Sequence, residues 1–393
     1  MFLARGALPR TVIVLGLVSL ANDAASEMIT PLLPVLLTAT LGAGPAIVGL
    51  VEGVAEATAS VLKVFSGRLA DRGFGARRLV LGGYGASNLA RPAIGLALGW
   101  TWVLGLRFLD RLGKGLRTAP RDAMIAAAVS PGLRGRAFGF HRAMDHAGAV
   151  LGPLLAFGLL AMGCSVPQVF AWSLVPGLVV LALIWKGLEP DEPAKPIRPP
   201  PIALRSLDPR LRGLIGAAGL LSLSALPEVL MVLWATSGGL PVTGVPLLWA
   251  AASLAKMAVV VPAGALTDRL GPVPVLLGGW SLRIVLLVGL AVTAPGATGI
   301  WAGFIAYSVA LALTEAPERS LIGDAAPAAL RGTAFGVYHL AIGLFALPGA
   351  VLLGLLWEHA GSRAAFLAAA GLTAVAAGLM LFSAGRPAGR TSG

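Results

Sequence analysis

The segment APRDAMIAAAVSPGLRGRAFGF, residues 119–140, recurs without a gap as APERSLIGDAAPAALRGTAFGV at residues 316–337. The same 197-residue offset places GRLADR, residues 67–72, on GALTDR, residues 264–269. Matches at one shared offset in two distant parts of the chain indicate an internal duplication. The sequence therefore predicts two copies of one structural unit, each occupying about half of the 393 residues.

The amino-acid composition indicates that this repeated unit lies in a lipid bilayer and not in water. Hydrophobic residues make up 57% of the chain and charged residues 12%, whereas soluble domains average roughly 45–50% and about 25%. The mean hydropathy of +0.85 is also too high for a chain that stays in water. Because a membrane-spanning helix needs about 20 apolar residues, with a turn at each end, this length accommodates about twelve spans.

Apolar runs separated by Gly, Pro and charge clusters define the expected spans. Lipid leaves backbone polar groups without partners, and the runs are too long and unalternating for barrel strands, so we expect helices. We therefore predict an all-α polytopic membrane protein with 12 transmembrane helices in two pseudo-symmetric bundles. Residues 1–187 form one six-helix bundle, 188–208 a Pro- and charge-rich cytoplasmic linker, and 209–393 the second bundle with a short tail. The expected spans are 10–38, 45–70, 77–99, 101–127, 134–162, 166–187, 209–237, 243–267, 272–294, 297–325, 331–358 and 362–384.

The distribution of charge predicts orientation. Thirty Lys and Arg against 18 Asp and Glu give a net charge of +12, but the basic residues collect in alternate loops and form no patch for nucleic acid. The intervening loops 38–45, 98–101, 162–168, 238–243 and 294–299 contain no Lys or Arg. By the positive-inside rule, we expect a multi-pass protein of the plasma or inner membrane with both termini in the cytoplasm. The basic residues on that side are Arg5, Arg10, Arg72, Arg77, Arg78, Arg134, Arg136, Lys186, Lys195, Arg198, Arg205, Arg210, Arg212, Arg269, Arg331, Arg386 and Arg390.

Few residues favour catalysis. The single cysteine, Cys164, excludes an intrachain disulfide and any CxxC metal or redox motif. The four histidines, His141, His146, His339 and His359, occur in no HExxH motif. We therefore expect that the protein is not an enzyme and holds neither a cofactor nor a resident metal. We also expect the chain to be monomeric in the bilayer. A nontransporting membrane sensor or a polytopic membrane enzyme remains a remote alternative.

Two parallel six-helix repeats with a substrate path between them are typical of transporters. GRLADR with Arg77 and Arg78, and its second copy at 264–269, resemble the loop between helices two and three of the major facilitator superfamily. The likeness extends over essentially the whole chain, and it implies that superfamily's fold. It also implies roles in the gating loops for Gly67, Asp71, Arg72, Asp268 and Arg269.

A second resemblance concerns the fifth expected span. Gly148, Gly152 and Pro153 match the core of the superfamily's Gly-Pro motif, which is associated with antiporters. Gly and Pro at this spacing permit close helix contact and a local bend. The resemblance favours efflux by antiport.

Ionisable residues inside the spans carry the functional prediction. Each costs ~2.5–3.5 kcal/mol in hydrocarbon on insertion scales and should face a cavity or a partner. Steps of three and four residues place Arg107, Asp110 and Lys114 on one helix face, which we expect to reach the central cavity and to share one site for substrate and proton. The predicted substrate and proton pathway comprises Asp23, Glu27, Glu52, Glu56, Lys63, Arg91, Arg107, Asp110, Lys114, His141, Arg142, Asp145, Glu228, Lys256, Arg283 and Glu315.

These charges favour a proton-coupled carrier. Proton and substrate compete for a carboxylate in a cavity of low dielectric constant, and nearby guanidinium groups grip an anion when the acids are neutral. We therefore predict a secondary active transporter that moves a small polar or anionic organic solute by alternating access. The alternative cargo is a metal ion or an anionic metal chelate. Its oxygen and nitrogen ligands would come from Asp23, Glu27, Glu52, Glu56, His141 and Asp145.

Overall fold

The computed structural model describes residues 8–71, 74–130, 133–190, 209–293, 296–325 and 331–384. Within these ranges the regular structure is helical and contains no strand. The all-α prediction is therefore confirmed for the described chain. Helices are the form in which long apolar runs satisfy their own backbone groups in lipid.

The first half begins with a broken helix. α1 (Arg10–Ile29) is followed by η1 (Thr30–Leu32), α2 (Leu33–Val35) and η2 (Leu36–Thr40). Pro31 and Pro34 lack the N–H that a continuous helix needs, which accounts for the break. The remaining helices of this half are α3 (Pro45–Asp71), α4 (Ala76–Ile94), α5 (Trp100–Ala127), α6 (Arg134–Ala161), α7 (Val166–Trp172) and α8 (Leu174–Gly187).

The second half starts in the same way. α9 (Pro209–Leu223) ends before a non-helical stretch that contains Pro227, and α10 (Glu228–Ser237) resumes the segment. The other helices are α11 (Gly244–Leu270), α12 (Pro272–Val292), α13 (Ala297–Ala325) and α14 (Arg331–Ala384). α14 turns at Gly361, whose φ of 82° is a conformation that glycine adopts without strain. Its two limbs are the last two predicted spans.

Charge explains why some spans are less apolar than others. Among the described residues, 8 helical stretches are long and apolar enough to cross a membrane. The remaining long helices, α3, α4 and α5, contain many of the ionisable residues predicted to form the pathway. Together with these three helices and the second limb of α14, the described chain has a helix at the position of each of the twelve expected spans, although α3, α4 and α5 are not among the 8 membrane-capable stretches.

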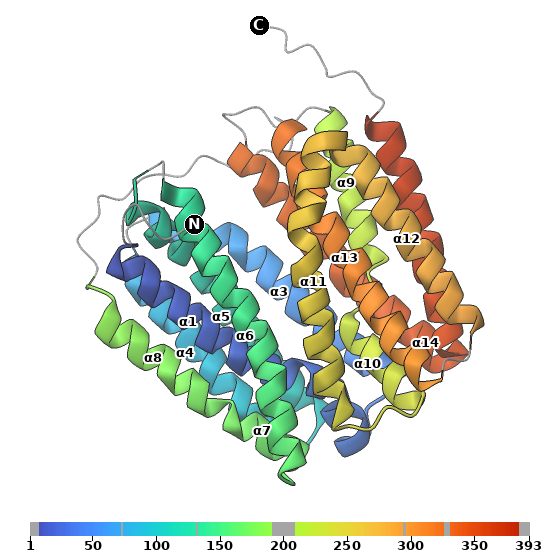
Figure 1. The fold of residues 1–393 in the computed structure, drawn as a ribbon, viewed down its shortest axis with the longest axis horizontal. Helices are drawn as coiled ribbons and strands as arrows, with labels where there is room; N and C mark the ends of the chain where they lie inside the picture. Colours follow the sequence, from blue (N-terminus) through green and yellow to red (C-terminus); the bar gives the residue numbers. More distant parts are fainter. Residues whose placement is uncertain are drawn as a thin grey trace, which may run out of the picture.

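The two halves share a core at one end only. Buried residues of both halves, including Leu32, Val51, Leu230 and Trp234, form one apolar cluster at the end that carries α7 and α10. Toward the end where α1 begins, each half has its own separate cluster. Figure 1 shows the corresponding shape, in which the ribbons of the two halves converge at the α7 and α10 end and diverge at the opposite end.

Close backbone contact joins the halves along α3 and α14. A Cβ added at Gly49 would lie 2.3 Å from the carbonyl oxygen of Ala350, and one at Gly354 would lie 2.8 Å from that of Pro45. At the shared-core end, the backbone N–H of Ala46 donates to Oε2 of Glu358 at 3.0 Å. α6 and α11 form the other long contact between the halves.

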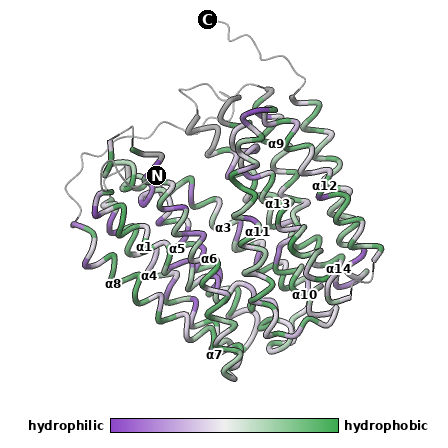
Figure 2. Tube along the Cα trace, in the orientation of Figure 1, coloured by the Kyte–Doolittle hydropathy of each residue, from purple (hydrophilic) through white to green (hydrophobic). Residues whose placement is uncertain are grey.

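Hydropathy differs between the inner and outer helices. Figure 2 shows hydrophilic segments along α3 and α6, whereas α12 is mainly hydrophobic. Many large apolar side chains on the outer helices are exposed, for example Trp185 of α8 and Val285 of α12. Such a surface is suited to lipid, and the polar residues are left to the interior.

Candidate functional site

A cavity of about 590 Å³ lies between the two halves. Its size falls in the range of small-molecule sites. Both halves line it, with ionisable residues from α1, α6, α10, α11 and α13. The lining residues are Glu27, Arg142, His146, Ala149, Glu228, Trp249, Ser253, Lys256, Val260, Leu311, Ala312, Thr314, Glu315 and Glu318.

Glu228 and Lys256 form an ion pair in this cavity. Lys256 Nζ donates to Oε1 and Oε2 of Glu228 at 3.1 and 3.0 Å, and both side chains are partly exposed. The hydroxyl of Ser308 donates to Glu228 Oε1 at 2.6 Å. The ion pair thus links α10, α11 and α13 within the second half.

The break between α9 and α10 positions Glu228 at a helix N-terminus. Arg283 Nη2 donates to the carbonyl oxygen of Ser224 at 2.5 Å, and the Tyr307 hydroxyl donates to that of Leu226 at 2.8 Å. These contacts satisfy carbonyl groups that the break leaves without helical partners. The buried Arg283 forms no ion pair with a described carboxylate. The C-terminal dipole of α9 supplies the compensating partial negative charge.

Glu27 reaches across to the second half. Trp249 Nε1 of α11 donates to Glu27 Oε2 of α1 at 2.8 Å. In the described part of the chain, no Lys, Arg or His lies within 4.0 Å of the Glu27 carboxylate. The centroid of the Trp249 ring also lies 5.8 Å from Lys256 Nζ. Trp249 therefore contacts both Glu27 of the first half and Lys256 of the second half.

A smaller cavity of about 250 Å³ adjoins the same residues. Glu228 and Trp249 line it together with Glu52 and Glu56 of α3. Glu56 is exposed and accepts a hydrogen bond from the Ser60 hydroxyl at 3.1 Å. The carboxylates of α3 therefore lie beside the central cavity.

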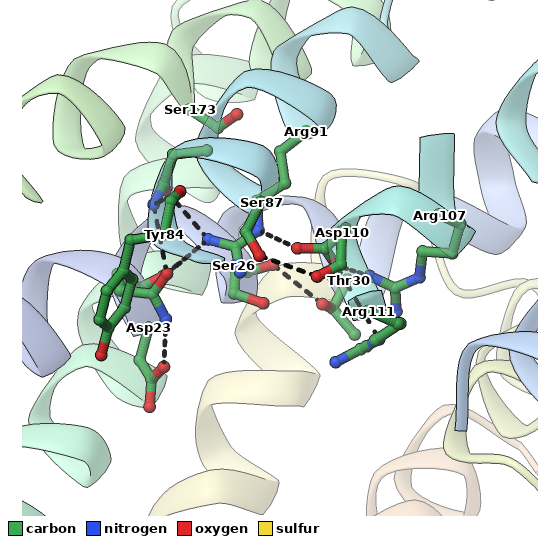
Figure 3. Close-up of polar contacts among 12 residues, drawn as sticks. Asp23, Ser26, Thr30, Tyr84, Ser87, Arg91, Arg107, Asp110, Arg111 and Ser173 are labelled. Atoms are coloured by element: carbon green, nitrogen blue, oxygen red, sulfur yellow. Dashed lines mark hydrogen bonds and ion pairs between the residues drawn. The ribbon is translucent and has the colours of Figure 1, made fainter. Parts of the chain in front are cut away.

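The charged residues of α4 and α5 form a separate buried cluster (Figure 3). Arg91 Nε donates to Asp110 Oδ1 at 3.0 Å, and Arg107 Nη1 lies 3.3 Å from Asp110 Oδ2. Arg107 Nη2 donates to Glu52 Oε1 at 2.8 Å. Arg91 also donates to the side-chain oxygens of Asn22 and Asn88, which ties α1 to the cluster.

This cluster changes the predicted role of α5, which corresponds to the fourth expected span. We expected Arg107 and Asp110 to reach the central cavity, but the side chains of both are 0% exposed and neither lines it. Glycine explains the burial, because α4 and α5 approach so closely that a Cβ at Gly83 would lie 2.6 Å from the carbonyl oxygen of Gly113. The expectation that Arg107 is open to an anionic substrate is therefore wrong for this state of the protein.

Four of the remaining predicted pathway residues, Asp23, His141, Arg142 and Asp145, lie on α1 and α6 around the seam where these helices make contact. Asp145 accepts hydrogen bonds from the Ser19 hydroxyl and, at 3.3 Å, from Arg142 Nη1. The buried His141 has its Nδ1 3.6 Å from Asp145 Oδ2. Asp23 accepts from Asn22 at 3.0 Å. Lys63 and Lys114 are half-buried and line neither cavity.

The Gly-Pro motif lies at this same seam. A Cβ at Gly148 would be 2.4 Å from the carbonyl oxygen of Leu20, and one at Gly152 would be 2.5 Å from that of Ala24. Pro153 is buried within α6. Only glycine permits this approach of α6 to the stretch of α1 that carries Asp23 and Glu27.

The expected gating residues are only partly described. Gly67 and Asp71 belong to α3, but the environment of Asp71 and the whole of Arg72 lie outside the described residues. Asp268 and Arg269 lie in the last turn of α11, where both are exposed. They are not part of either cavity lining.

The acids predicted as metal ligands have separate partners. Glu52 pairs with Arg107, Asp145 with Arg142, and Glu27 accepts from Trp249. Among the described residues, no three His, Cys, Asp or Glu side chains gather as they would to hold a metal ion. The geometry therefore gives the metal-cargo alternative no support.

Uncharged site residues escaped the sequence prediction. Trp249, Tyr307 and Ser308 contact the cavity acids or the helix break, but they carry no charge that marks them inside an apolar span. Pro227, at the break itself, is a local signal beside the predicted Glu228 that would have directed attention to this region.

Comparison with known proteins is consistent with this architecture. The chain is 30% identical over 358 residues to the uncharacterized MFS-type transporter MJ1317 of Methanocaldococcus jannaschii, covering 89% of each chain. It is 33% identical over 162 residues to the multidrug resistance protein MdtH of Photorhabdus laumondii, covering 41% of this chain and 39% of MdtH.

A solved structure shows the same fold. The inward-facing, unoccupied bacterial homologue of the human lysosomal transporter Spinster superposes with a TM-score of 0.77 at 15% identity, over 96% of this chain and 98% of that one. The sequence profile of the Major Facilitator Superfamily matches residues 15–237 and 214–393. Profile, relatives and fold agree, and the chain therefore belongs to the major facilitator superfamily of membrane transporters.

Proposed function

We propose that the protein is a proton-coupled secondary transporter that exports a small polar organic solute by alternating access. The observation that carries this proposal is the cavity between the two halves, which brings Glu27 of the first half together with Glu228 and Lys256 of the second. Ionisable residues at membrane depth mark substrate and proton pathways. The interface between the repeats is where such transporters bind their cargo.

The arrangement of cores supports alternating access. The shared apolar cluster closes the α7 and α10 end, whereas the halves have separate cores at the other end. With both termini in the cytoplasm, as the basic loops predict, the structure corresponds to a state open toward the cytoplasm. Rocking of the two halves about the cavity would separate the shared cluster and expose the cavity on the other side.

Glu27 offers a physical route to proton coupling. Its carboxylate accepts an inter-half hydrogen bond from Trp249 and has no cation within 4.0 Å among the described residues. A charged acceptor forms a stronger hydrogen bond than a neutral one. Protonation of Glu27 therefore weakens one contact between the halves, and that is a direct link between proton binding and conformation. Glu228 offers a second such carboxylate, held against Lys256.

Two observations favour export by antiport. The Gly148, Gly152 and Pro153 motif packs α6 against the stretch of α1 that holds Glu27. The partial relatives named multidrug resistance proteins are consistent with efflux. We propose a monomer in the plasma or inner membrane, with both termini cytoplasmic.

Proton release by everted vesicles tests this function. Vesicles containing the protein are acidified inside, which quenches the dye 9-amino-6-chloro-2-methoxyacridine, and then receive a panel of cationic, zwitterionic and anionic solutes. An antiporter moves protons out as solute enters, so at least one solute should restore the fluorescence. Vesicles with Glu27→Gln should give no recovery. The absence of recovery with every solute, or equal recovery in Glu27→Gln, would contradict proton antiport through this cavity.

A further inference from the structure

We propose that the central cavity binds an organic cation, and that the Lys256 ammonium group occupies the cation site while the solute is absent. This inference names the substrate class of the proposed transporter. It rests on that proposal only for the assumption that this cavity is where the solute binds.

The surroundings of Lys256 are those of a bound ammonium ligand. Nζ contacts both oxygens of Glu228 at 3.0 and 3.1 Å, and it lies 5.8 Å from the centroid of the Trp249 ring. A carboxylate together with an aromatic face is the combination that binds substituted ammonium groups. The same Trp249 holds Glu27 through its indole N–H, so a second carboxylate lies beside the site.

The charges that line the cavity favour a cation. Among the described residues, four carboxylates line it, against two side chains with permanent positive charge, Lys256 and Arg142. Arg142 pairs with Asp145, which lies outside the lining, and Lys256 pairs with Glu228. The guanidinium group of Arg107, which we expected to bind an anion, and that of Arg91 are buried against Asp110 and Glu52. An entering anion would meet the acids without their help.

The Lys256 side chain therefore competes with a solute cation for binding to Glu228. It reaches Glu228 from the neighbouring helix, so its effective concentration at the site is high and any solute cation must displace it. Val260, Leu311 and Ala149 line the same cavity and provide apolar surface for the body of such a solute. Glu27 and Glu315, two further carboxylates of the cavity lining, also interact electrostatically with Lys256.

Two isosteric probes of opposite charge test the assignment. Binding of tetraphenylphosphonium and of tetraphenylborate is measured on the purified full-length protein in detergent, without any gradient. The wild type should bind the cation at least about tenfold more tightly than the anion. Because no proton movement is measured, this result is independent of whether coupling occurs.

Substitution of Lys256 separates the two charge classes. Lys256→Gln removes the competitor and should tighten tetraphenylphosphonium binding about tenfold. Lys256→Arg keeps a tethered cation and should stay close to wild type. Glu228→Gln should weaken binding about tenfold or more. Glu189→Gln, at an exposed acid beyond the end of α8, should leave binding unchanged.

Several results would overturn the proposal. The wild-type protein could bind tetraphenylborate more tightly than tetraphenylphosphonium, or it could bind neither probe. The Lys256→Gln protein could also bind the cation more weakly than the wild type while melting at the wild-type temperature. If Lys256→Gln cannot be purified in folded form, the wild-type preference between the two probes decides the question. Failure of the proposed function would appear differently, as cation binding without proton release in the everted vesicles.

Discussion

Trp249 of α11 and Glu27 of α1 are joined by a 2.8 Å hydrogen bond that crosses between the two halves of the protein. The bond lies where the central cavity meets the shared apolar cluster, since Trp249 belongs to both. A carboxylate that lines the central cavity thus also contacts a residue of the shared apolar cluster. A change in the charge of Glu27 therefore alters both the charge of the cavity lining and the hydrogen bond between the halves.

Removal of this hydrogen bond should loosen the contact between the halves. Trp249→Phe keeps an apolar ring and removes the indole donor, and Glu27→Gln keeps an acceptor without the charge. We expect each single variant to lower stability by about 1 kcal/mol. In a double-mutant cycle, the thermal melting of the four proteins should reveal coupling between the two positions. Fully additive effects would show that the bond contributes nothing.

Arg107 is predicted to be structural. Its guanidinium is buried between Glu52 and Asp110, so Arg107→Ala would leave Glu52 without its ion-pair partner and would remove one of the guanidinium partners of Asp110. We expect a loss of roughly 3–5 kcal/mol, measured as a large fall in the melting temperature. Arg142→Ala removes a largely exposed partner of Asp145 and should change the melting temperature little. A stable Arg107→Ala protein that only loses solute binding would contradict this assignment.

The seam between α1 and α6 should tolerate no side chain larger than glycine. Gly148→Ala or Gly152→Ala would place Cβ within 2.5 Å of backbone carbonyl oxygens of α1. We expect a cost of about 1–3 kcal/mol from overpacking in each case. Gly158→Ala is the matched control on the same helix, where nothing lies within 4 Å of the added atom. Equal melting temperatures for Gly148→Ala and Gly158→Ala would show that the seam is not close-packed.

Orientation can be measured with the natural cysteine. Cys164 follows α6 in a loop at the shared-core end and is partly exposed. If both termini are cytoplasmic, a membrane-impermeant maleimide should label Cys164 in intact cells. A Cys164→Ser protein with Gly75→Cys, before α4 at the other end, should react only after the membrane is opened. The reverse pattern would invert the topology.

The repeat explains why the fold was predictable. The 197-residue offset and the apolar runs specify the order of helices, and Pro31, Pro34 and Pro227 mark the breaks in the first helix of each half. Each of these signals is local in the sequence or repeats along it. They do not depend on which helices come into contact.

The direction in which each charge points was not predictable. Helical spacing places Arg107, Asp110 and Lys114 on one face, but it does not say which helix covers that face. The answer depends on the approach of α4 through Gly83 and Gly113, which brings Arg91 to Asp110. Trp249 is a further example, since its contact with Glu27 joins residues 222 positions apart. Contacts of this kind arise only from tertiary packing.

The proposed transport mechanism requires that the cavity between the halves opens alternately to the two sides of the membrane. Ser253 lines that cavity, and a Cys164→Ser, Ser253→Cys protein reports its access to an impermeant methanethiosulfonate reagent. We expect rapid reaction in everted vesicles and much slower reaction in intact cells. Acidifying the external medium should speed the slow reaction, because protonation of Glu27 weakens its bond to Trp249. Reaction from neither side, or equal and pH-independent reaction from both, would contradict the account.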